Sequence, residues 1–364
     1  MRIWARRLPT ASPSDCSALQ NILDRGEIDA AQVMAIIGKT EGNGGRNDFS
    51  RELAVRAFAD CLAQASNLSR EEIEAQVVLS FSGGTEGIVS PHVLVLARLD
   101  DGMPQPGCKR LAVAVAQTRD FAPQEVGRMA MVQETARVVR ELMQELMVAD
   151  PADVHLVQIK GAIPAVSAAE QHDAAASGQP LRCDMVHSRA ASALGVAVAT
   201  GEVRAGEITD DSIARDFALY SSVASCSSKP GLQRSEIVLF ANVSHYGGDL
   251  LMAHGVMQDI IDAEAVRAVL AKLGFETPGQ LKPEETARLV GIFAKADADP
   301  RGIVRGRRHT MWSDDDIDDT RHARAVVSSV LAAVTGETAV YVSTRAEHHG
   351  PLGGGPIAIM ARVP

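Results

Sequence analysis

One combination of residues occurs three times along this chain and limits how the chain can fold. In each copy an apolar run ends in a lysine, an arginine follows near the expected start of a helix, and a serine then occupies a turn beside another apolar run. In chain order the sets are Lys39, Arg51 and Ser82, then Lys160, Arg189 and Ser227, then Lys295, Arg321 and Ser343. The repeating unit is several times longer than a solenoid repeat, so the copies are expected to be domains rather than turns of a superhelix.

The apolar residues around these sets predict a common α/β unit. Short runs at 33–38, 154–159 and 289–294 are typical of buried strands, and apolar positions at helical spacing follow each arginine. Each unit is interpreted as strand, helix, strand, helix, strand, strand. In each unit polar residues are expected to cap the helix that carries the arginine. They are Asn47 and Asp48 in the first unit, Ser188 in the second, and Asp319 and Thr320 in the third.

Two stretches rich in proline and glycine, near 104–109 and 247–250, divide the chain. The predicted fold is three similar α/β domains around a pseudo-threefold axis, forming a central β-barrel-like core with helices outside. The predicted units are residues 1–104, 110–248 and 250–364. Around such an axis equivalent residues converge, so three lysines, three arginines and three serines are expected to share one central site.

Lysine and serine together indicate a type of chemistry. A neutral lysine can act as a general base that makes a serine hydroxyl nucleophilic, and both burial and nearby cations favour the neutral amine. A single strand-end lysine is more often an ordinary surface residue, but three in register favour the catalytic interpretation. Arginines offer forked donors to a carbonyl or anionic oxygen, and turn amides can stabilise an oxyanion. The turns in question are Ser82-Gly83, Ser227-Ser228 and Ser343-Thr344.

Composition excludes several other classes of protein. The net charge of −10 is spread along the chain, which argues against nucleic acid or an anionic membrane as the main partner. No apolar run has the length of a spanning helix or a signal peptide, so a cytoplasmic location is expected. The five cysteines are scattered without a Cys-x-x-Cys pair, and Cys226 is interpreted as a packing residue. Gly38-Lys39-Thr40 lacks the upstream glycine of a P-loop, and the common serine-hydrolase and zinc-protease motifs are absent.

A glycine- and proline-rich segment, 346–356, leaves two interpretations open. Its backbone carbonyls could bind one hard cation with Asp297 supplying charge, or the segment could simply close the last hairpin. The acidic run at 314–319 is better explained as a solvated helix start than as a metal site.

Longer motifs resemble a known family. They are Gly38-Lys39-Thr40-Glu41-Gly42-Asn43-Gly44, Ser82-Gly83-Gly84-Thr85-Glu86-Gly87, Phe293-Ala294-Lys295-Ala296, Arg305-Gly306, His309-Thr310-Met311, Glu347-His348-His349-Gly350-Pro351 and Gly353-Gly354-Gly355-Pro356. Together they resemble the cyanuric acid hydrolase and barbiturase family of ring-opening amidohydrolases, nearly from end to end.

The resemblance implies a homotetramer of three-domain chains that binds a small cyclic imide or triazine between three Ser-Lys dyads. It pairs Lys39 with Ser82, Lys160 with Ser227 and Lys295 with Ser343, and makes Ser227 the nucleophile with Lys160 as its base. The substrate contacts that it implies are Arg51, Arg189 and Arg321 with Ser82, Gly83, Ser227, Ser228, Ser343 and Thr344. It implies no organic cofactor, and a structural Mg or Ca ion at Asp297, Ala346, His349, Gly350, Pro351 and Gly354.

Three departures from the family pattern bear on these expectations. Ser343-Thr344-Arg345 stands where Ser-Gly-Gly is usual, Asp297 stands for a glutamate, and Lys229-Pro230 reads as an insertion that leaves Ser227 and Ser228 both open. Cyanuric acid is the expected substrate because its threefold ring suits three similar units. Barbituric acid, a non-catalytic binder of cyclic imides and a metal-dependent amidohydrolase remain the alternatives.

Overall fold

Three four-stranded sheets with the same strand order form the centre of the structure. The computed structural model describes residues 1–276 and 278–363. In each sheet the order is the unit's first strand, last strand, second strand and third strand: β1-β4-β2-β3, β5-β8-β6-β7 and β9-β14-β10-β13. The second and third strands are parallel and the other pairs are antiparallel. The threefold repeat read from the sequence is therefore a repeat of topology as well.

The strands of each sheet lie inside one predicted unit. The first sheet contains β1 (Arg2–Pro9), β2 (Val33–Thr40), β3 (Val78–Gly83) and β4 (His92–Leu99). The second contains β5 (Arg110–Gln117), β6 (Val154–Ile163), β7 (Ala224–Pro230) and β8 (Glu236–Val243). The third contains β9 (Leu250–Met257), β10 (Leu289–Lys295), β13 (Tyr341–Ser343) and β14 (Gly355–Arg362). The exact domain boundaries stay a prediction.

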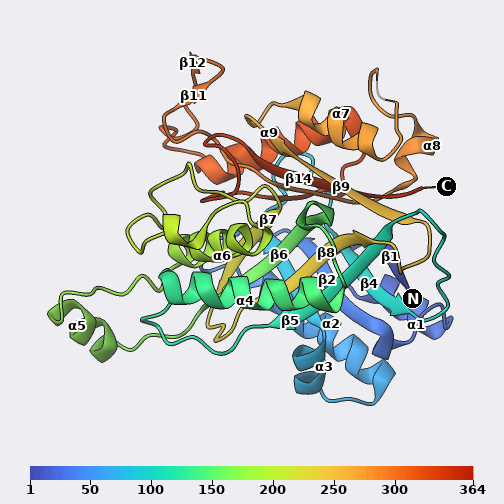
Figure 1. Ribbon diagram of the computed structural model, residues 1–364, viewed down its shortest axis with the longest axis horizontal. Helices are drawn as coiled ribbons and strands as arrows, with labels where there is room; N and C mark the ends of the chain where they lie inside the picture. Colours follow the sequence, from blue (N-terminus) through green and yellow to red (C-terminus); the bar gives the residue numbers. More distant parts are fainter. Residues whose placement is uncertain (277, 364) are drawn as a thin grey trace.

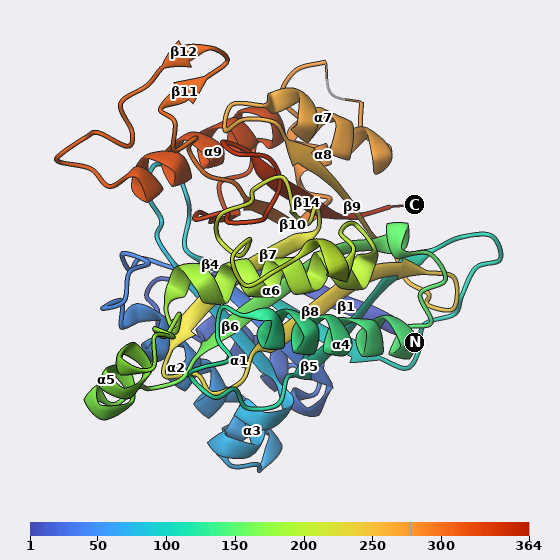
Figure 2. The same ribbon diagram turned by 60° about the vertical axis from the view of Figure 1, so that its left-hand side comes forward.

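Helices cover the outside of the sheets (Figure 1). They are α1 (Ser17–Asp24), α2 (Ser50–Ser66) and α3 (Arg70–Gln76), then α4 (Met129–Glu145), α5 (Ala168–Ala176) and α6 (Met185–Thr200), then α7 (Ala263–Lys272), α8 (Pro283–Thr286) and α9 (Asp319–Thr335). A small hairpin, β11 (Ile303–Val304) and β12 (Arg307–Arg308), projects from the third unit as α5 does from the second (Figure 2). Both segments follow strands that end near a repeated lysine.

The hydrophobic core has one central and three peripheral parts. The central cluster joins buried residues of all three sheets, among them Ile37, Leu239 and Phe293. Two peripheral clusters each fill the space between one sheet and its own helices, and the third packs mainly α4 and α6 of the second unit against each other. Strands such as β2, buried along their whole length, carry a continuous apolar run because both of their faces are covered.

Two details of the predicted fold are wrong, although the α/β class with three similar units and outer helices is confirmed. Among the described residues the sheets remain separate and none closes into a barrel, because the units meet through side chains of the central cluster. Ser188 is not a helix cap, since α6 begins earlier and Asp184 accepts the N–H of His187. Ser188 instead lies inside the helix and donates to the carbonyl of Ala162. Asp319 and Thr320 are not caps either, because both lie inside α9 and Asp318 accepts the N–H of Thr320.

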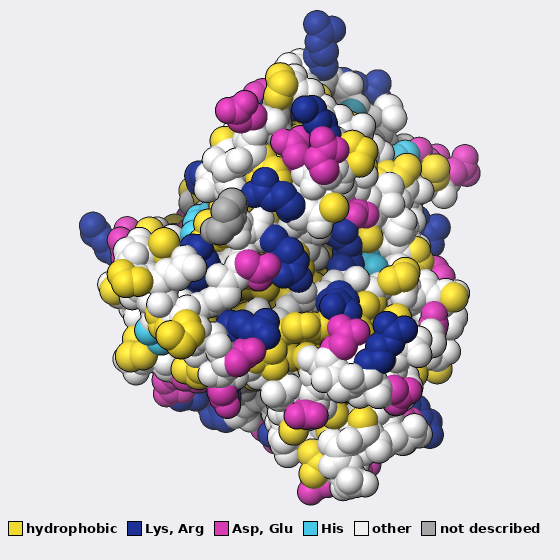
Figure 3. All heavy atoms as spheres, turned by 90° about the vertical axis from the view of Figure 1, so that its right-hand side faces the viewer, with side chains coloured by type: hydrophobic (Ala, Val, Ile, Leu, Met, Phe, Trp, Pro, Cys, Tyr) yellow, Lys and Arg dark blue, Asp and Glu magenta, His cyan; other side chains and the backbone are white. Residues whose placement is uncertain are grey.

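One face of the molecule and the lengths of its helices bear on which partners the protein could bind. Figure 3 shows basic and acidic side chains intermixed on the face at the right of Figure 1, so this face carries no broad patch of one sign. Across residues 1–276 and 278–363, no helix combines the length and hydrophobicity needed to cross a bilayer.

A histidine pair joins the second and third units at the end of β6 that lies away from Lys160. Nδ1 of His155 is 2.8 Å from Nδ1 of His254, and Nε2 of His155 is 2.6 Å from the amide nitrogen of Asn242. The same amide nitrogen of Asn242 donates to the carbonyl of Met252, and the amide oxygen accepts the backbone N–H of Met252. These two bonds fix the orientation of the amide, so its nitrogen is the donor to His155. His155 is therefore neutral and donates through Nδ1 to His254.

We expect this pair to make the protein less stable in mild acid. Burial lowers the pKa of His155 to about 3 and that of His254 to about 4. His254, Lys272 and Lys109 lower the pKa of His155 further, while Lys272 lowers and Glu202 raises that of His254. The unfolded chain binds more protons below about pH 6.5, so stability is present above that pH and is lost as the pH falls toward 4. Urea unfolding at pH 7 and pH 5 should show a loss of about 4 kcal/mol from this pair, about 2 kcal/mol for each histidine. A double variant, His155→Leu with His254→Leu, should show a smaller difference between the two pH values; an equal difference would contradict the assignment.

Candidate active site

A single cavity collects residues from all three units. It has a volume of about 580 Å³. Every predicted catalytic and substrate-binding residue lines it except Lys39, which lies beneath the surface and is 1% exposed. The repeated residues of the three units therefore lie around one cavity, as expected from the sequence.

The parallel strand pairs place each lysine beside its serine. In register, Lys39 lies opposite Ser82 on β3, Lys160 opposite Ser227 on β7, and Lys295 opposite Ser343 on β13. The Nζ–Oγ distances are 3.5 Å, 2.9 Å and 3.1 Å in that order. The second pair is the closest.

The same register decides between the two neighbouring serines of the second unit. Ser227 faces Lys160, whereas Ser228 is buried and its hydroxyl donates to the carbonyl of Met185. Ser227 is thus the hydroxyl that a basic Lys160 can reach. Ser228 lines the cavity beside it.

Each of two lysines is also held by a neighbouring unit. Nζ of Lys39 donates to the carbonyl of Val342 in the third unit, at 2.9 Å. Nζ of Lys160 donates to the carbonyl of Phe81 in the first unit. Both acceptors precede a repeated serine, so the turn that ends with one serine also positions the lysine of another unit.

All three amines lie where the neutral form is favoured. Burial lowers the pKa of Lys39 and Lys160 well below the ordinary lysine value, and Arg324 and Arg51 lower them further, respectively. Burial lowers the pKa of Lys295 to about 7, with Arg189 adding to the effect. A neutral lysine beside a serine hydroxyl is the arrangement that general-base activation of serine requires.

Arginine–glutamate pairs cross two of the three unit boundaries. Arg189 of the second unit binds Glu347 of the third through Nη2 and Nε, at 2.8 Å and 2.9 Å. Arg324 of the third unit binds Glu86 of the first through Nη2 and Nε, at 2.7 Å and 2.5 Å. Burial alone would raise the pKa of both glutamates, but the facing arginine holds each below its usual range. Forked pairs of this kind fix the guanidinium planes that border the cavity.

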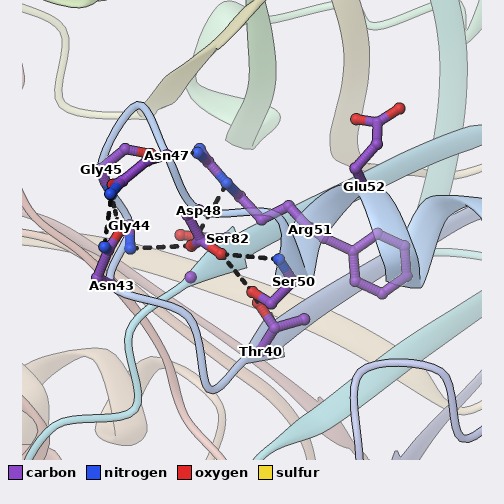
Figure 4. A network of polar contacts seen from close by, with 12 residues as sticks. Thr40, Asn43, Gly44, Gly45, Asn47, Asp48, Ser50, Arg51, Glu52 and Ser82 are labelled. Atoms are coloured by element: carbon purple, nitrogen blue, oxygen red, sulfur yellow. Dashed lines mark hydrogen bonds and ion pairs between the residues drawn. The ribbon is translucent and has the colours of Figure 1, made fainter.

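Among residues 1–276 and 278–363 the third boundary has no arginine–glutamate pair of this kind, and Arg51 is held within its own unit (Figure 4). Its Nη2 donates to the carbonyl of Gly45 at 2.5 Å, and its Nε lies 3.5 Å from Asp48. Asp48 is shared, because it also accepts the N–H groups of Gly44 and Ser50. The charge of Arg51 is therefore the least compensated of the three at the cavity.

Arg324 is a site residue that the sequence interpretation missed. Both Arg321 and Arg324 line the cavity, but Arg321 is half exposed and lies 3.7 Å from Glu86, whereas Arg324 is buried. A local signal was available, since His322-Ala323-Arg324-Ala325 matches His187-Ser188-Arg189-Ala190. Arg324 is the structural equivalent of Arg189, and Arg321 is a second, outer cation.

The residue two places after the first serine limits how closely Arg324 can approach. At Gly84 the φ angle is +102°, and a Cβ would lie 2.5 Å from Nε of Arg324. The equivalent position in the third unit is Arg345, which adopts φ +60° despite its side chain. Arg345 binds Asp319 at 2.9 Å and lies over the ring of Trp312, so it borders the cavity without entering the serine turn.

Comparison with known proteins identifies the family. The sequence profile described as amidohydrolase ring-opening protein matches residues 5–362. A cyanuric acid amidohydrolase of Enterobacter cloacae is 43% identical over 370 residues, covering 100% of both chains. The chain belongs to this family of ring-opening amidohydrolases. It is accordingly a hydrolytic enzyme.

Solved structures of ring-opening amidohydrolases share the whole fold. A cyanuric acid hydrolase structure superposes with a TM-score of 0.92 at 43% identity, covering 100% of this chain and 99% of the other. A cyanuric acid hydrolase from A. caulinodans superposes with a TM-score of 0.86 at 41% identity, with the same coverage. The resemblance stated from the motifs is confirmed at the level of family and fold.

The residues expected to hold a cation in this family fit a hard ion better than a transition metal. Asp297 accepts the N–H of Arg345 at 2.9 Å, and its own N–H faces the carbonyl of Gly354. Burial raises the pKa of Asp297 to about 6, so its charge lacks full compensation. Both ring nitrogens of His349 are engaged, with the N–H of Cys226 and the carbonyl of Glu347, which leaves only its backbone oxygen. A carboxylate with carbonyl oxygens is the donor set that Mg²⁺ or Ca²⁺ prefers.

The rest of that set lies in the same closing loop. Ala346, Pro351 and Gly354 offer carbonyls, each of which also accepts one backbone N–H, and a carbonyl can accept two partners. Gly350 adopts φ +82°, which turns the loop there. No group of three or more histidine, cysteine or acidic side chains suited to a metal occurs within the described ranges. The site, if filled, would hold the loop that supports β7 through His349 and Cys226.

Proposed function

We propose that this enzyme opens the ring of cyanuric acid by hydrolysing one endocyclic C–N bond, with Ser227 as nucleophile and Lys160 as its base. The observation that carries the proposal is the convergence of three Lys–Ser pairs on one cavity, with the shortest distance, 2.9 Å, in the second pair. Both residues of that pair line the cavity, whereas Lys39 of the first pair does not. The names of the relatives, cyanuric acid amidohydrolases, support the choice of substrate.

The chemistry follows from the arrangement of the pair. Neutral Lys160 takes the proton of the Ser227 hydroxyl while Oγ bonds to a ring carbonyl carbon. As the C–N bond breaks, the same proton passes from Lys160 to the departing ring nitrogen. The freed amine of Lys160 then takes a proton from water as the water oxygen bonds to the carbamoyl-serine carbon, and it returns that proton to Oγ as the C–O bond to serine breaks. Lys160 ends each cycle neutral, as it began.

Stabilisation of the developing oxyanion comes from the cavity walls. Arg51, Arg189 and Arg324 line the cavity together with the three serine turns, whose backbone N–H groups can stabilise an oxyanion. Cyanuric acid carries three carbonyls and three ring nitrogens around a threefold axis, so each carbonyl can face one unit. Barbituric acid has only part of this pattern and is the second substrate to compare.

Parallel incubation with cyanuric and barbituric acids tests the proposal. Loss of ring absorbance should be faster with cyanuric acid, and the product should contain one opened C–N bond. Activity should survive a chelator, because no step uses a metal. Binding measured by calorimetry without product would show a non-catalytic binder instead, and faster turnover of barbituric acid would overturn the choice of substrate.

Three further properties stay proposals. A Mg²⁺ or Ca²⁺ ion held by Asp297 and the closing-loop carbonyls would supply positive charge that fixes this loop. A homotetramer would form, as the family resemblance implies, and light scattering measures it directly. A cytoplasmic location follows from the sequence interpretation alone.

A further inference from the structure

The three lysines have different neighbours on the strand at their other side. In the antiparallel pair of β2 with β4, Lys39 lies opposite His92. In the pair of β6 with β8, Lys160 lies opposite Glu236. In the third unit Ala294 of β10 lies opposite Ile357 of β14, which places Pro356 opposite Lys295. Residues directly opposite each other in a sheet project on the same face, so of these three lysines Lys160 alone has a carboxylate at the facing position of the antiparallel strand.

We infer that Glu236 is a positioning residue that converts the second dyad into a Ser227–Lys160–Glu236 triad, by stabilising the ammonium formed when Lys160 takes the serine proton. The inference rests on the proposed function, since it assigns a role to a residue behind the proposed base. Carboxylates also act on the other two lysines, Glu86 on Lys39 and both Glu347 and Asp297 on Lys295, but these lie in loops and not on the facing strand.

The charges around Lys160 show why an anion is needed there. Arg51, Lys229 and Lys295 all oppose a positive charge on Lys160, and Glu236 favours it. Nζ of Lys160 already contacts the carbonyl of Phe81 and Oγ of Ser227. Glu236 therefore acts through its field rather than through a hydrogen bond to the amine. This parallels the aspartate of a Ser-His-Asp triad, which stabilises the protonated base without taking its proton.

Other groups around Glu236 bring its own ionisation close to neutral pH. Burial raises the pKa of Glu236 to about 7; Lys229 and Lys160 lower it, while Glu74 and Glu52 raise it. Lys229 is itself paired with Glu52, at 2.8 Å near the surface. Glu236 thus gains its negative charge in the pH range where a neutral Lys160 must become an ammonium transiently.

The test is the pH profile of Glu236→Gln in the intact enzyme. Without the carboxylate an ammonium at Lys160 is less favourable, so kcat should fall about 10- to 100-fold with KM nearly unchanged. The acidic limb of kcat should also move down by about one pH unit, because Lys160 then stays neutral at lower pH. Glu236→Asp should recover part of kcat and of the limb. A purely structural role for Glu236 would not move the limb.

His92→Gln is the matched control, since His92 occupies the equivalent position beside Lys39. It should leave the position of the acidic limb unchanged. The inference is overturned if Glu236→Gln keeps kcat within about twofold and the limb in place while the parent enzyme hydrolyses cyanuric acid. Absence of hydrolysis by the parent enzyme would instead overturn the proposed function, so the two failures can be told apart.

Discussion

Replacing Ser227 with alanine should lower kcat for cyanuric acid by at least about 10⁴-fold, because the variant loses the atom that bonds to the ring carbonyl. The serine Oγ lies 2.9 Å from the amine of Lys160, so the change removes both nucleophile and proton donor. The measurement is single-turnover ring opening with purified protein. Substrate affinity should change little, because the serine contributes only part of the cavity wall.

The equivalent serines provide the comparison. Ser82→Ala and Ser343→Ala also remove a hydroxyl that lines the cavity, but from pairs separated by 3.5 Å and 3.1 Å. Each should cost at least tenfold less in kcat than Ser227→Ala. Near-normal turnover by Ser227→Ala, with loss in Ser343→Ala, would move the nucleophile to the third unit.

Replacing Arg324 with methionine should reduce both activity and stability. The variant removes a forked contact to the Glu86 carboxylate and leaves that carboxylate without its main partner. Breaking a fully buried pair costs about 3–5 kcal/mol, and partial exposure of Glu86 reduces the expected loss to about 2–3 kcal/mol. kcat/KM should fall about 100-fold or more, since an oxyanion-stabilising cation is lost from the cavity wall.

Arg321→Met is the matched control, because it removes the same charge from a neighbouring, more exposed position. Arg321 lies one helical turn before Arg324, is half exposed, and is 3.7 Å from the same glutamate. Its loss should cost less than about 1 kcal/mol in urea unfolding and less than about tenfold in kcat/KM. If Arg321→Met proved the more damaging of the two, the outer arginine would be the substrate contact that the sequence interpretation named.

Much of the fold and most of the site could be predicted because local patterns carry them. The lysine at the end of each apolar run and the serine in each turn are fixed by strand pairing, which follows from alternation and length. The sequence interpretation named Arg321 and missed Arg324, because residues three apart share one face of a helix and both arginines reach the cavity. In the structure Arg324 is buried and forms a forked contact with Glu86, 238 residues away in the chain, whereas Arg321 is half exposed and lies 3.7 Å from that glutamate.

Other features depend on contacts between units and have no local signal. The separate sheets, rather than a barrel-like core, reflect how the inner faces pack against one another. The pairing of Arg189 with Glu347, and the absence of an equivalent glutamate opposite Arg51, appear only when the units are assembled. The neighbour of each lysine on the antiparallel strand is likewise invisible until the register is known.

The carbonyls that hold Lys39 and Lys160 come from the third and first units, respectively. The first and second units are therefore incomplete as reaction centres on their own, because the lysine of each is anchored by the backbone of another unit, whereas Lys295 is held by Ser343 and Thr344 of its own unit. Either of the first two units cut out of the chain would lose its anchor even if it kept its own lysine and serine. Because the three copies are joined in one polypeptide, these contacts between units form within one folded chain, whereas separate subunits would first have to associate.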